Sequence, residues 1–315
     1  MIHRIEMPMP GMLGTVNCYL VVNSGRAALI DTGMASERNV AIMEKQLARW
    51  GVKASRLEKV LCTHYHPDHC GLGKFFQESG TPVLLSRDDA EEMARWQESP
   101  LQDEQLATFY GEHELPVDFR KEVTPIFAYL RSLRQPFRPD VLPEGDGAID
   151  IAGIPFVLLH TTGHTDGHVC FFQPDTRVLV AGDHILGHSL VNIVTKYQSR
   201  FNSPLAQYLL SLKKISALGT MTAITAHGDP VADVPARCEA LAALHHSRII
   251  EVKRTLSRTP QSAYELSCRA FGQKRRTFSK WLNMAQTISC IEYLEQCGEV
   301  DCHQMRNRKR YSSVG

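Results

Sequence analysis

Short apolar runs alternate with longer amphipathic stretches along residues 1–235 of the chain. A run of roughly four to eight apolar residues predicts a strand, whereas apolar positions three or four apart predict a helix. Strands are predicted at residues 18–22, 26–30, 59–62, 154–159, 169–172, 178–181 and 222–225, and helices at residues 37–50 and 204–218. Asn23-Ser24-Gly25 separates the first two strands and predicts a hairpin. The alternation indicates an α/β fold.

Residues 86–147 interrupt this pattern with charged and aromatic residues at helical spacing, broken by prolines. The spacing predicts two or three helices inserted between strands. The insertion holds six aromatic side chains of interest: Trp96, Phe109, Tyr110, Phe119, Phe127 and Tyr129. They could form an apolar wall for an acyl chain. Packing of helix on helix, or contact with a second subunit in a homodimer, is the commoner use of such residues.

Beyond residue 235 the pattern is helical, with stretches at residues 237–258, 262–271 and 277–296 before a short hairpin and a basic tail. Three helices followed by a hairpin are typical of a winged-helix domain. The balance of basic and acidic residues also changes near residue 235. Residues 245–315 hold 13 Lys and Arg against 6 Asp and Glu, which leaves 22 against 28 elsewhere from totals of 35 and 34. We therefore predict two domains, at residues 1–235 and 236–315.

Bulk composition narrows the class of protein. Hydrophobic residues make up 43% of the 315 positions and charged residues 22%, as in folded globular proteins. The nine cysteines form no CxxC pair and their number is odd, which favours free thiols in a reducing compartment. The opening residues lack the pattern of a signal peptide, and no apolar run reaches roughly 18 residues. The expected location is the cytoplasm, without membrane contact.

The ends of four predicted strands carry residue types that bind metal ions. A six-residue turn after the strand at 59–62 supplies four of them and three other strand ends supply the rest: His64, His66, Asp68 and His69, then His164, Asp183 and His227. Neutral imidazoles and carboxylates are the usual ligands of zinc, iron and manganese. A lone histidine after a strand is more often a hydrogen-bonded surface residue. Seven such side chains at four strand ends instead predict a metal centre.

These motifs resemble those of the metallo-β-lactamase superfamily over roughly residues 5–232. The family's HxHxDH motif is matched at residues 64–69, and its later ligand motifs follow in the expected order. The resemblance implies an αββα sandwich with two divalent metal ions at one edge, most simply zinc, with iron or manganese as alternatives. It assigns His64, His66 and His164 to one ion and Asp68, His69 and His227 to the other. It makes Asp183 the bridge between them and gives Asp31, in Leu-Ile-Asp-Thr-Gly, a supporting role.

The bridging residue and the C-terminal segment indicate which branches of the superfamily the chain resembles. True β-lactamases of the family usually have cysteine where this chain has Asp183, which argues against antibiotic hydrolysis and fits the thioesterase, lactonase and nuclease branches. With a winged helix after the hydrolase domain, the chain resembles the branch of the superfamily that contains proteins of the β-lactamase-like protein 2 type. That branch contains mitochondrial endoribonuclease-like proteins and fungal thioesterases of polyketide pathways. The insertion at 86–147 is longer than the minimal family core.

The first functional hypothesis is a dinuclear hydrolase in which a metal-activated hydroxide attacks a thioester or another small acyl ester. Asp68 is the candidate catalytic residue, because it can orient the nucleophile and carry its proton. The alternative is an RNA-processing endonuclease that uses the same metals and holds nucleic acid with the winged helix. A binding protein without catalysis is a third hypothesis, which the intact ligand set disfavours.

Several other residues could assist either reaction. His168 and His188 are nominated as additional histidines near the ligands, although His168 fits a supporting hydrogen bond better than a catalytic one. Anionic substrate ends could be held by Lys196, Tyr197 and Arg200, and a solvated loop is an equal alternative for these residues.

The C-terminal basic residues are the observation that favours nucleic acid. They are Lys274, Arg275, Arg276 and Lys280 before and within the third helix, and Arg306, Arg308, Lys309 and Arg310 in the hairpin. However, the third helix carries Glu292, Glu295 and many apolar residues, which make a poor surface for a groove of nucleic acid. Packing against the hydrolase domain is therefore the favoured role of this helix, and nucleic-acid binding is the less favoured one.

Overall fold

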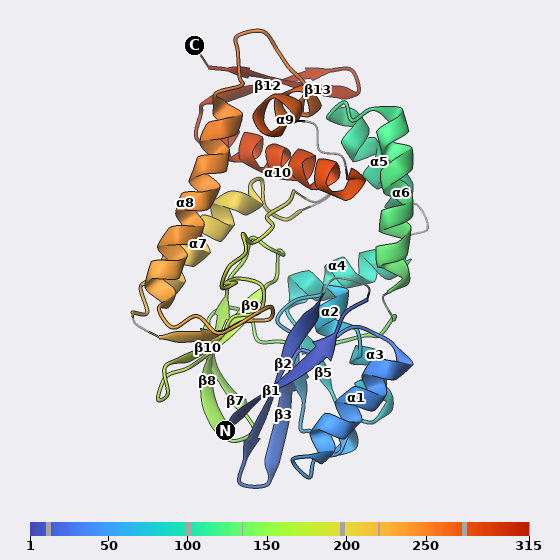
Figure 1. Cartoon of the computed structure of the whole chain (residues 1–315), viewed down its shortest axis with the longest axis vertical. Helices are drawn as coiled ribbons and strands as arrows, with labels where there is room; N and C mark the ends of the chain where they lie inside the picture. The colour runs from blue at the N-terminus through green and yellow to red at the C-terminus, as the bar shows by residue number, and fades with distance from the viewer. Residues whose placement is uncertain are drawn as a thin grey trace.

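Two β-sheets and the helices around them form the body of the molecule (Figure 1). The computed structural model describes residues 1–10, 14–98, 102–133, 135–195, 199–219, 221–272 and 276–314. The first sheet contains β1 (Ile2–Pro8), β2 (Thr15–Asn23), β3 (Arg26–Ile30), β4 (Val60–Leu61), β5 (Val83–Leu85) and β6 (Asp140–Val141), in that order. The second contains β7 (Gly147–Ile151), β8 (Ile154–His160), β9 (Val169–Gln173), β10 (Val178–Val180) and β11 (Thr222–Ile224).

The strand directions bring several loops to one edge of the two sheets. In the first sheet β3, β4, β5 and β6 run parallel, so the chain leaves each of them in the same direction. In the second sheet β8 and β10 are both antiparallel to β9, and β11 is parallel to β10. The carboxyl ends of β8, β10 and β11 therefore also share one edge. All of the predicted strands form, and the predicted hairpin is confirmed, with Ser24 and Gly25 at φ 46° and 82° in its turn.

Three hydrophobic clusters define the layers of the sandwich. Side chains of both sheets, such as Ile30 and Phe171, pack together between them. The outer face of the first sheet is covered by α1 (Glu37–Ala48) and α3 (Gly73–Glu78). The outer face of the second is covered by α7 (Pro204–Ser216) and α8 (Val234–Lys253). The layers are therefore α, β, β and α, as predicted. The short helices η1 (Ala54–Arg56) and α2 (Pro67–Cys70) lie in loops.

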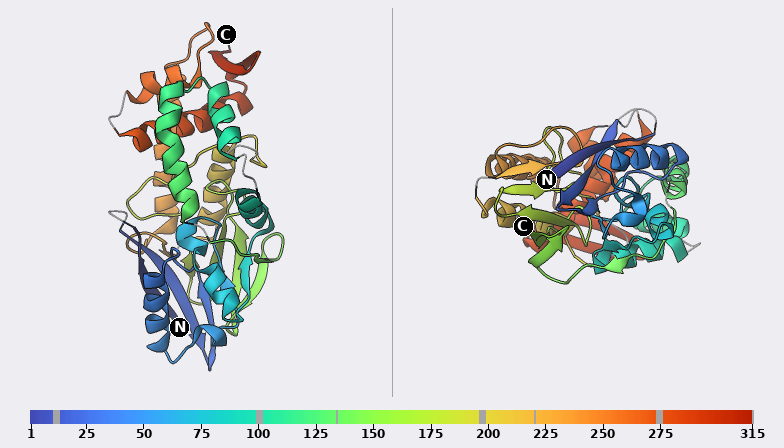
Figure 2. Two further views of the ribbon diagram at one scale, coloured as in Figure 1. Left: turned by 90° about the vertical axis from the view of Figure 1, so that its right-hand side faces the viewer. Right: turned by 90° about the horizontal axis from the view of Figure 1, so that it is seen from below.

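The insertion forms three helices, α4 (Arg87–Glu98), α5 (Gln102–Glu112) and α6 (Val117–Ser132). Figure 2 shows α6 running along the long axis of the molecule. Phe109, Tyr110 and Phe119 are buried, and the ring of Phe127 lies 5.1 Å from that of Trp281. Most of the aromatic residues thus pack helix on helix, which was the commoner of the two interpretations. Two of the six differ, because Trp96 donates to Glu92 and Tyr129 is exposed.

The C-terminal segment contains α8, α9 (Ala263–Phe271) and α10 (Thr277–Gln296), followed by the hairpin of β12 (Val300–Met305) and β13 (Arg308–Ser313). This order agrees with the predicted one, and α10 has the predicted bounds. Helix α8 begins before the predicted residue 237, because Asp233 caps its first turn and Pro235 lies within that turn. It ends at Lys253, before the predicted residue 258. The assignment as a winged-helix domain and the boundary at residue 235 stay predictions.

The buried side chains of the C-terminal segment share a core with the rest of the chain. Leu266 of α9 and Ile288 of α10 belong to the same hydrophobic cluster as Phe172 of β9 and Tyr208 of α7. The C-terminal helices therefore belong to the layer that covers the second sheet, and they pack against the insertion as well. All nine cysteines are free and most are buried. Among the described residues, every helix is too short or too polar to cross a membrane.

This shared core leads to a prediction for Ile288→Ala. Ile288 is 1% exposed, so its truncation should lower the free energy of unfolding by about 2–5 kcal/mol. Ile250→Ala on α8 is the matched control, because its side chain is 47% exposed and its removal should cost about 1 kcal/mol or less. Chemical denaturation followed by circular dichroism measures both. An unfolding step of the C-terminal segment separate from the sandwich would contradict the shared core.

Candidate metal centre

The seven predicted ligands converge at the common edge of the two sheets. His64, His66, Asp68 and His69 lie on the loop after β4 and on α2, which begins at Pro67. The other three follow β8, β10 and β11: His164, Asp183 and His227. Their side chains form overlapping groups, each with ligand atoms within 4.8 Å of one another. The structure thus brings together every residue of the predicted set.

The first group consists of three imidazoles. His66 Nδ1 lies 2.9 Å from His64 Nε2 and 3.1 Å from His164 Nε2. Burial and the neighbouring imidazoles hold the pKa of His64 well below its usual range, so this ring is neutral at physiological pH. Three ring nitrogens that face one point are a protein ligand set found in catalytic zinc sites.

The second group combines a carboxylate with two imidazoles. Asp68 Oδ2 lies 3.4 Å from His227 Nε2 and 3.7 Å from His69 Nε2. Asp183 lies between the two groups. Its Oδ2 is 3.5 Å from His164 Nε2, and its Oδ1 is 3.4 Å from His227 Nε2. One carboxylate therefore faces both groups, one oxygen toward each.

Hydrogen bonds on the outer side of the rings fix which nitrogen faces inward. His164 Nδ1 lies 3.0 Å from the carbonyl oxygen of Asn192, and His227 Nδ1 lies 3.1 Å from that of Thr15. A carbonyl oxygen only accepts, so in the neutral form of each ring Nδ1 carries the hydrogen and Nε2 has the lone pair. That lone pair is the form that binds a metal ion.

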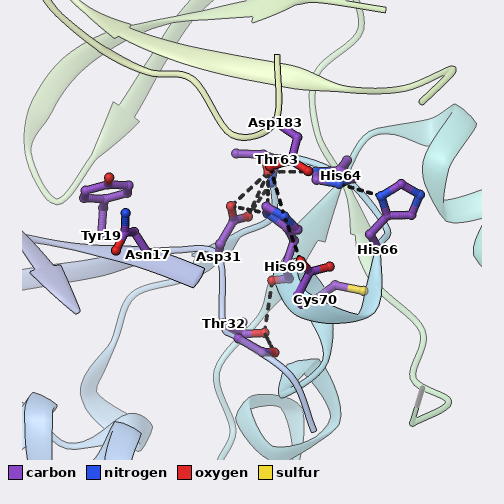
Figure 3. A network of polar contacts seen from close by, with 12 residues as sticks. Asn17, Tyr19, Asp31, Thr32, Thr63, His64, His66, His69, Cys70 and Asp183 are labelled. Atoms are coloured by element: carbon purple, nitrogen blue, oxygen red, sulfur yellow. Dashed lines mark hydrogen bonds and ion pairs between the residues drawn. The ribbon is translucent and has the colours of Figure 1, made fainter. Parts of the chain in front are cut away.

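Asp31 supports this arrangement from the end of β3 (Figure 3). Its carboxylate accepts from the amide of Thr63 at 2.7 Å and lies 2.8 Å from His69 Nδ1. Its backbone is in the left-handed region at φ 60°, which a residue other than glycine rarely adopts. Asp31 therefore touches the ring of His69 on the side away from the other ligands, which is the supporting role that the resemblance implied.

Two buried polar atoms at the centre of the cluster test whether metal ions would fit. His69 Nε2 and Asp183 Oδ1 are buried and have no hydrogen-bond partner among the described residues. Buried polar atoms of this kind nearly always have a partner in folded proteins, and a bound ion is one explanation of an exception. The two atoms lie 3.5 Å apart and face the same space, where a divalent cation would replace the proton on His69 Nε2. The residues present therefore fit divalent cations.

The charges of the cluster point to the same conclusion. Burial alone would lower the pKa of His69, but the carboxylates of Asp68, Asp31 and Asp183 outweigh it and raise this pKa to about 10. Burial would likewise raise the pKa of Asp68, yet His69 and His227 lower it to about 2. Three carboxylates around a few imidazoles create a strongly negative site, which attracts a proton or a metal ion.

His168 is placed behind the ligands. Its Nδ1 lies 2.8 Å from the hydroxyl of Thr161, and its Nε2 accepts from the amide of Asp183 at 3.2 Å. Gly182 permits this contact, because its φ is +50° and a Cβ there would lie 2.8 Å from both His168 Nε2 and Thr63 Cβ. His168 thus fixes the backbone that carries Asp183.

The remaining nominated residues lie elsewhere. His188 is exposed on the loop after β10, and Arg200 forms an ion pair with Asp88 at 2.6 Å. Lys196 and Tyr197, nominated for anionic substrate ends, lie outside the described residues, as do Lys274 and Arg275. The predicted anion-holding role of Arg200 is weakened, because its guanidinium already has a carboxylate partner.

Sequence reasoning missed Asp89, in the first turn of α4. Its buried carboxylate accepts from the amide of Tyr65 at 3.1 Å, the hydroxyl of Thr165 at 2.7 Å and the amide of Gly167 at 2.8 Å. Tyr65 lies between two ligands of the β4 loop, and Thr165 follows His164. Asp89 therefore joins the two loops that supply the three-imidazole group.

Comparisons with known proteins agree with this geometry. Residues 11–227 match the family described as the Metallo-beta-lactamase superfamily. "Probable metallo-hydrolase YqjP" of Bacillus subtilis (strain 168) is 28% identical over 306 residues, which cover 92% of this chain and 91% of that protein. The crystal structure of a metallo-beta-lactamase family protein from Thermus thermophilus is similar at a TM-score of 0.84 and 30% identity, covering 99% of this chain and 98% of that one.

A more distant relative carries a more specific name. The "Atrochrysone carboxyl ACP thioesterase" of Aspergillus fumigatus is 24% identical over 262 residues, which cover 82% of this chain but 48% of that protein. The chain thus spans about half the length of this relative.

The chain belongs to the metallo-β-lactamase superfamily, as its motifs predicted. The superfamily fold and the kinship with metallo-hydrolases are therefore confirmed, whereas the seven residues stay candidate ligands.

Asp89 provides a test of how the ligand loops are held. In Asp89→Asn an amide group replaces one oxygen and faces a hydrogen-bond donor, so we expect a loss of about 1–3 kcal/mol in unfolding free energy, together with weaker retention of metal. Asp88→Asn is the matched control, because its ion pair with Arg200 is solvent-accessible and contributes roughly 0–1 kcal/mol. Denaturation and metal analysis after gel filtration measure these effects. Equal behaviour of the two variants would contradict the role given to Asp89.

Proposed function

We propose that the protein is a dinuclear metal-dependent hydrolase of a thioester or another small acyl ester. The observation that carries this proposal is the convergence of seven imidazole and carboxylate side chains around His69 Nε2 and Asp183 Oδ1, two buried atoms that have no hydrogen-bond partner among the described residues. His64, His66 and His164 would hold one ion, and Asp68, His69 and His227 the other. Asp183 would be shared, since one of its oxygens faces each group.

The residues of the site suit this chemistry. When bound, two divalent ions lower the pKa of a water molecule and polarise the carbonyl group of an ester. The Asp68 carboxylate, which its neighbours keep ionised, is proposed to orient the attacking water and accept its proton. The outer hydrogen bonds of His164 and His227 hold the ligand nitrogens in place, so that little reorganisation accompanies the reaction.

Two considerations favour a thioester. A thiolate leaves readily because the pKa of a thiol is roughly 8.5, so the site needs no strong acid beside the leaving group. The relative from Aspergillus fumigatus is named a thioesterase. The proposed metal is zinc, with iron or manganese as alternatives, because imidazole and carboxylate ligands suit all three.

Two observations weigh against the alternative of an RNA-processing nuclease. Lys309 and Arg310 of the basic hairpin pair with Glu112 and Glu114 of the insertion, at 3.4 Å and 2.8 Å. Two of the four basic residues of the hairpin are therefore neutralised within the chain. Helix α10 is also largely buried from Met284 to Ile291, so it presents little surface to a groove.

The proposal is tested on the purified full-length protein. Metal analysis is expected to find two divalent ions per chain, and a panel of acyl thioesters, lactones and phosphodiesters is expected to show the highest kcat/KM for a thioester. His66→Ala should lower kcat/KM on the order of 100-fold. His246→Ala, an exposed histidine of α8, is the matched control and should retain the activity.

Three outcomes would overturn this proposal. A protein that binds no divalent ion would exclude the metal centre. Undiminished turnover by His66→Ala would remove the proposed ligand role. Cleavage of RNA in preference to every ester would instead support the nuclease.

A further inference from the structure

The C-terminal helix α10 reaches the metal centre through one extended segment. Residues 191–195 follow β10 and alternate in exposure, with Val191 at 1%, Ile193 at 2% and Thr195 at 7%, whereas Asn192 is exposed. The buried apolar members pack into the hydrophobic cluster that α8 and α10 share with the second sheet. The opposite side of the segment carries Asn192, whose carbonyl oxygen holds His164.

Helix α10 contacts this segment at three positions on one of its sides. Gln286 Nε2 donates to Asn192 Oδ1 at 2.9 Å. One turn further on, Ser289 lies 3.0 Å from the hydroxyl of Thr195, and that hydroxyl also donates to Glu292. The positions 286, 289 and 292 are spaced by three residues. The segment is thus bound at both ends by a single rigid element.

We propose that α10 is a positioning element of the metal centre and that Gln286 is the residue through which it acts. Gln286 holds the side chain of Asn192, and the main chain of Asn192 holds His164 Nδ1. Because His164 has its other nitrogen 3.1 Å from His66 Nδ1, the angle of its ring decides where the lone pair of Nε2 points. Gln286 is 122 positions from His164 in the sequence, yet it lies two hydrogen bonds from that ring.

The burial of the two α10 side chains supports a positioning role. Gln286 is 6% exposed and Ser289 is 1% exposed, whereas Asn192 is exposed, so the α10 side chains have little access to water and are costly to leave unpaired. A change of the Gln286 side chain therefore leaves Asn192 free to rotate. This mobility of Asn192 loosens its backbone carbonyl, which holds the ring of His164. This inference rests on the proposed function, since it assumes that His164 binds a metal ion.

The test uses zinc affinity rather than turnover. Zinc is titrated from the full-length protein with a chromophoric chelator. Gln286→Met keeps the length of the side chain but removes the donor, and it should weaken the more easily withdrawn zinc on the order of tenfold. Thr287→Val is the matched control. Thr287 is buried in the same helix and donates to the carbonyl of Asn283 at 2.7 Å, so its loss should change stability but alter zinc affinity by less than about twofold.

A double-mutant cycle separates positioning from general destabilisation. Asn192→Ala, at an exposed position that tolerates truncation, should weaken zinc as much as Gln286→Met does, and the double variant should be no weaker than either alone. In Gln286→Glu the amide of Asn192 can turn and donate to the carboxylate, so most of the affinity should return.

The outcomes distinguish this inference from the proposed function. Zinc affinity of Gln286→Met equal to that of Thr287→Val would overturn the role of Gln286 alone. Losses that add fully in the double variant would do the same, because they would show two independent effects. A wild-type protein that binds no zinc would overturn the metal centre itself.

Discussion

Negative charge held away from water is the constraint on which this structure depends. Three carboxylates, those of Asp31, Asp68 and Asp183, lie around His69, whose ring is fully buried. Such a group is stable only if cations or hydrogen-bond donors surround it. The donors around Asp31 come from the loop after β4, and the backbone of Asp183 is tied to His168. The parallel strand ends of two sheets are what bring these partners to one place.

The sequence was most informative where chemistry is local. The turn at 64–69 could be recognised directly, because four ligands fall in six positions after an apolar strand. The long helices were also predictable: α10 has the predicted bounds and α1 ends only two residues before the predicted end, leaving Trp50 in the following turn. Such helices can be predicted from their strong apolar periodicity and from the residue that ends them, with little contribution from the rest of the fold.

The elements that were missed carry weak local signals. Strand β1 alternates buried residues such as Ile5 and Met7 with charged ones, but it ends in a proline, Pro8, and a second proline follows at Pro10. Strands β5 and β6 have three and two residues, and no candidate ligand follows them to mark a strand end, as one does after the comparably short β4, β10 and β11. Asp89 was missed for another reason. An acidic residue in the first turn of a helix is ordinary, because it complements the helix dipole, and nothing local reveals that it joins two distant loops.

The partnership between the insertion and the C-terminal hairpin has a consequence for the order in which the molecule folds. Three successive residues of β13 contact Glu112, His113 and Glu114 of the insertion. His113 and Tyr311 are 198 positions apart in the sequence. Contacts between such distant positions slow folding, because the loop between them must close before the contact can form. The half of the sandwich that shares this core therefore keeps part of its apolar surface uncovered until the insertion and the hairpin meet.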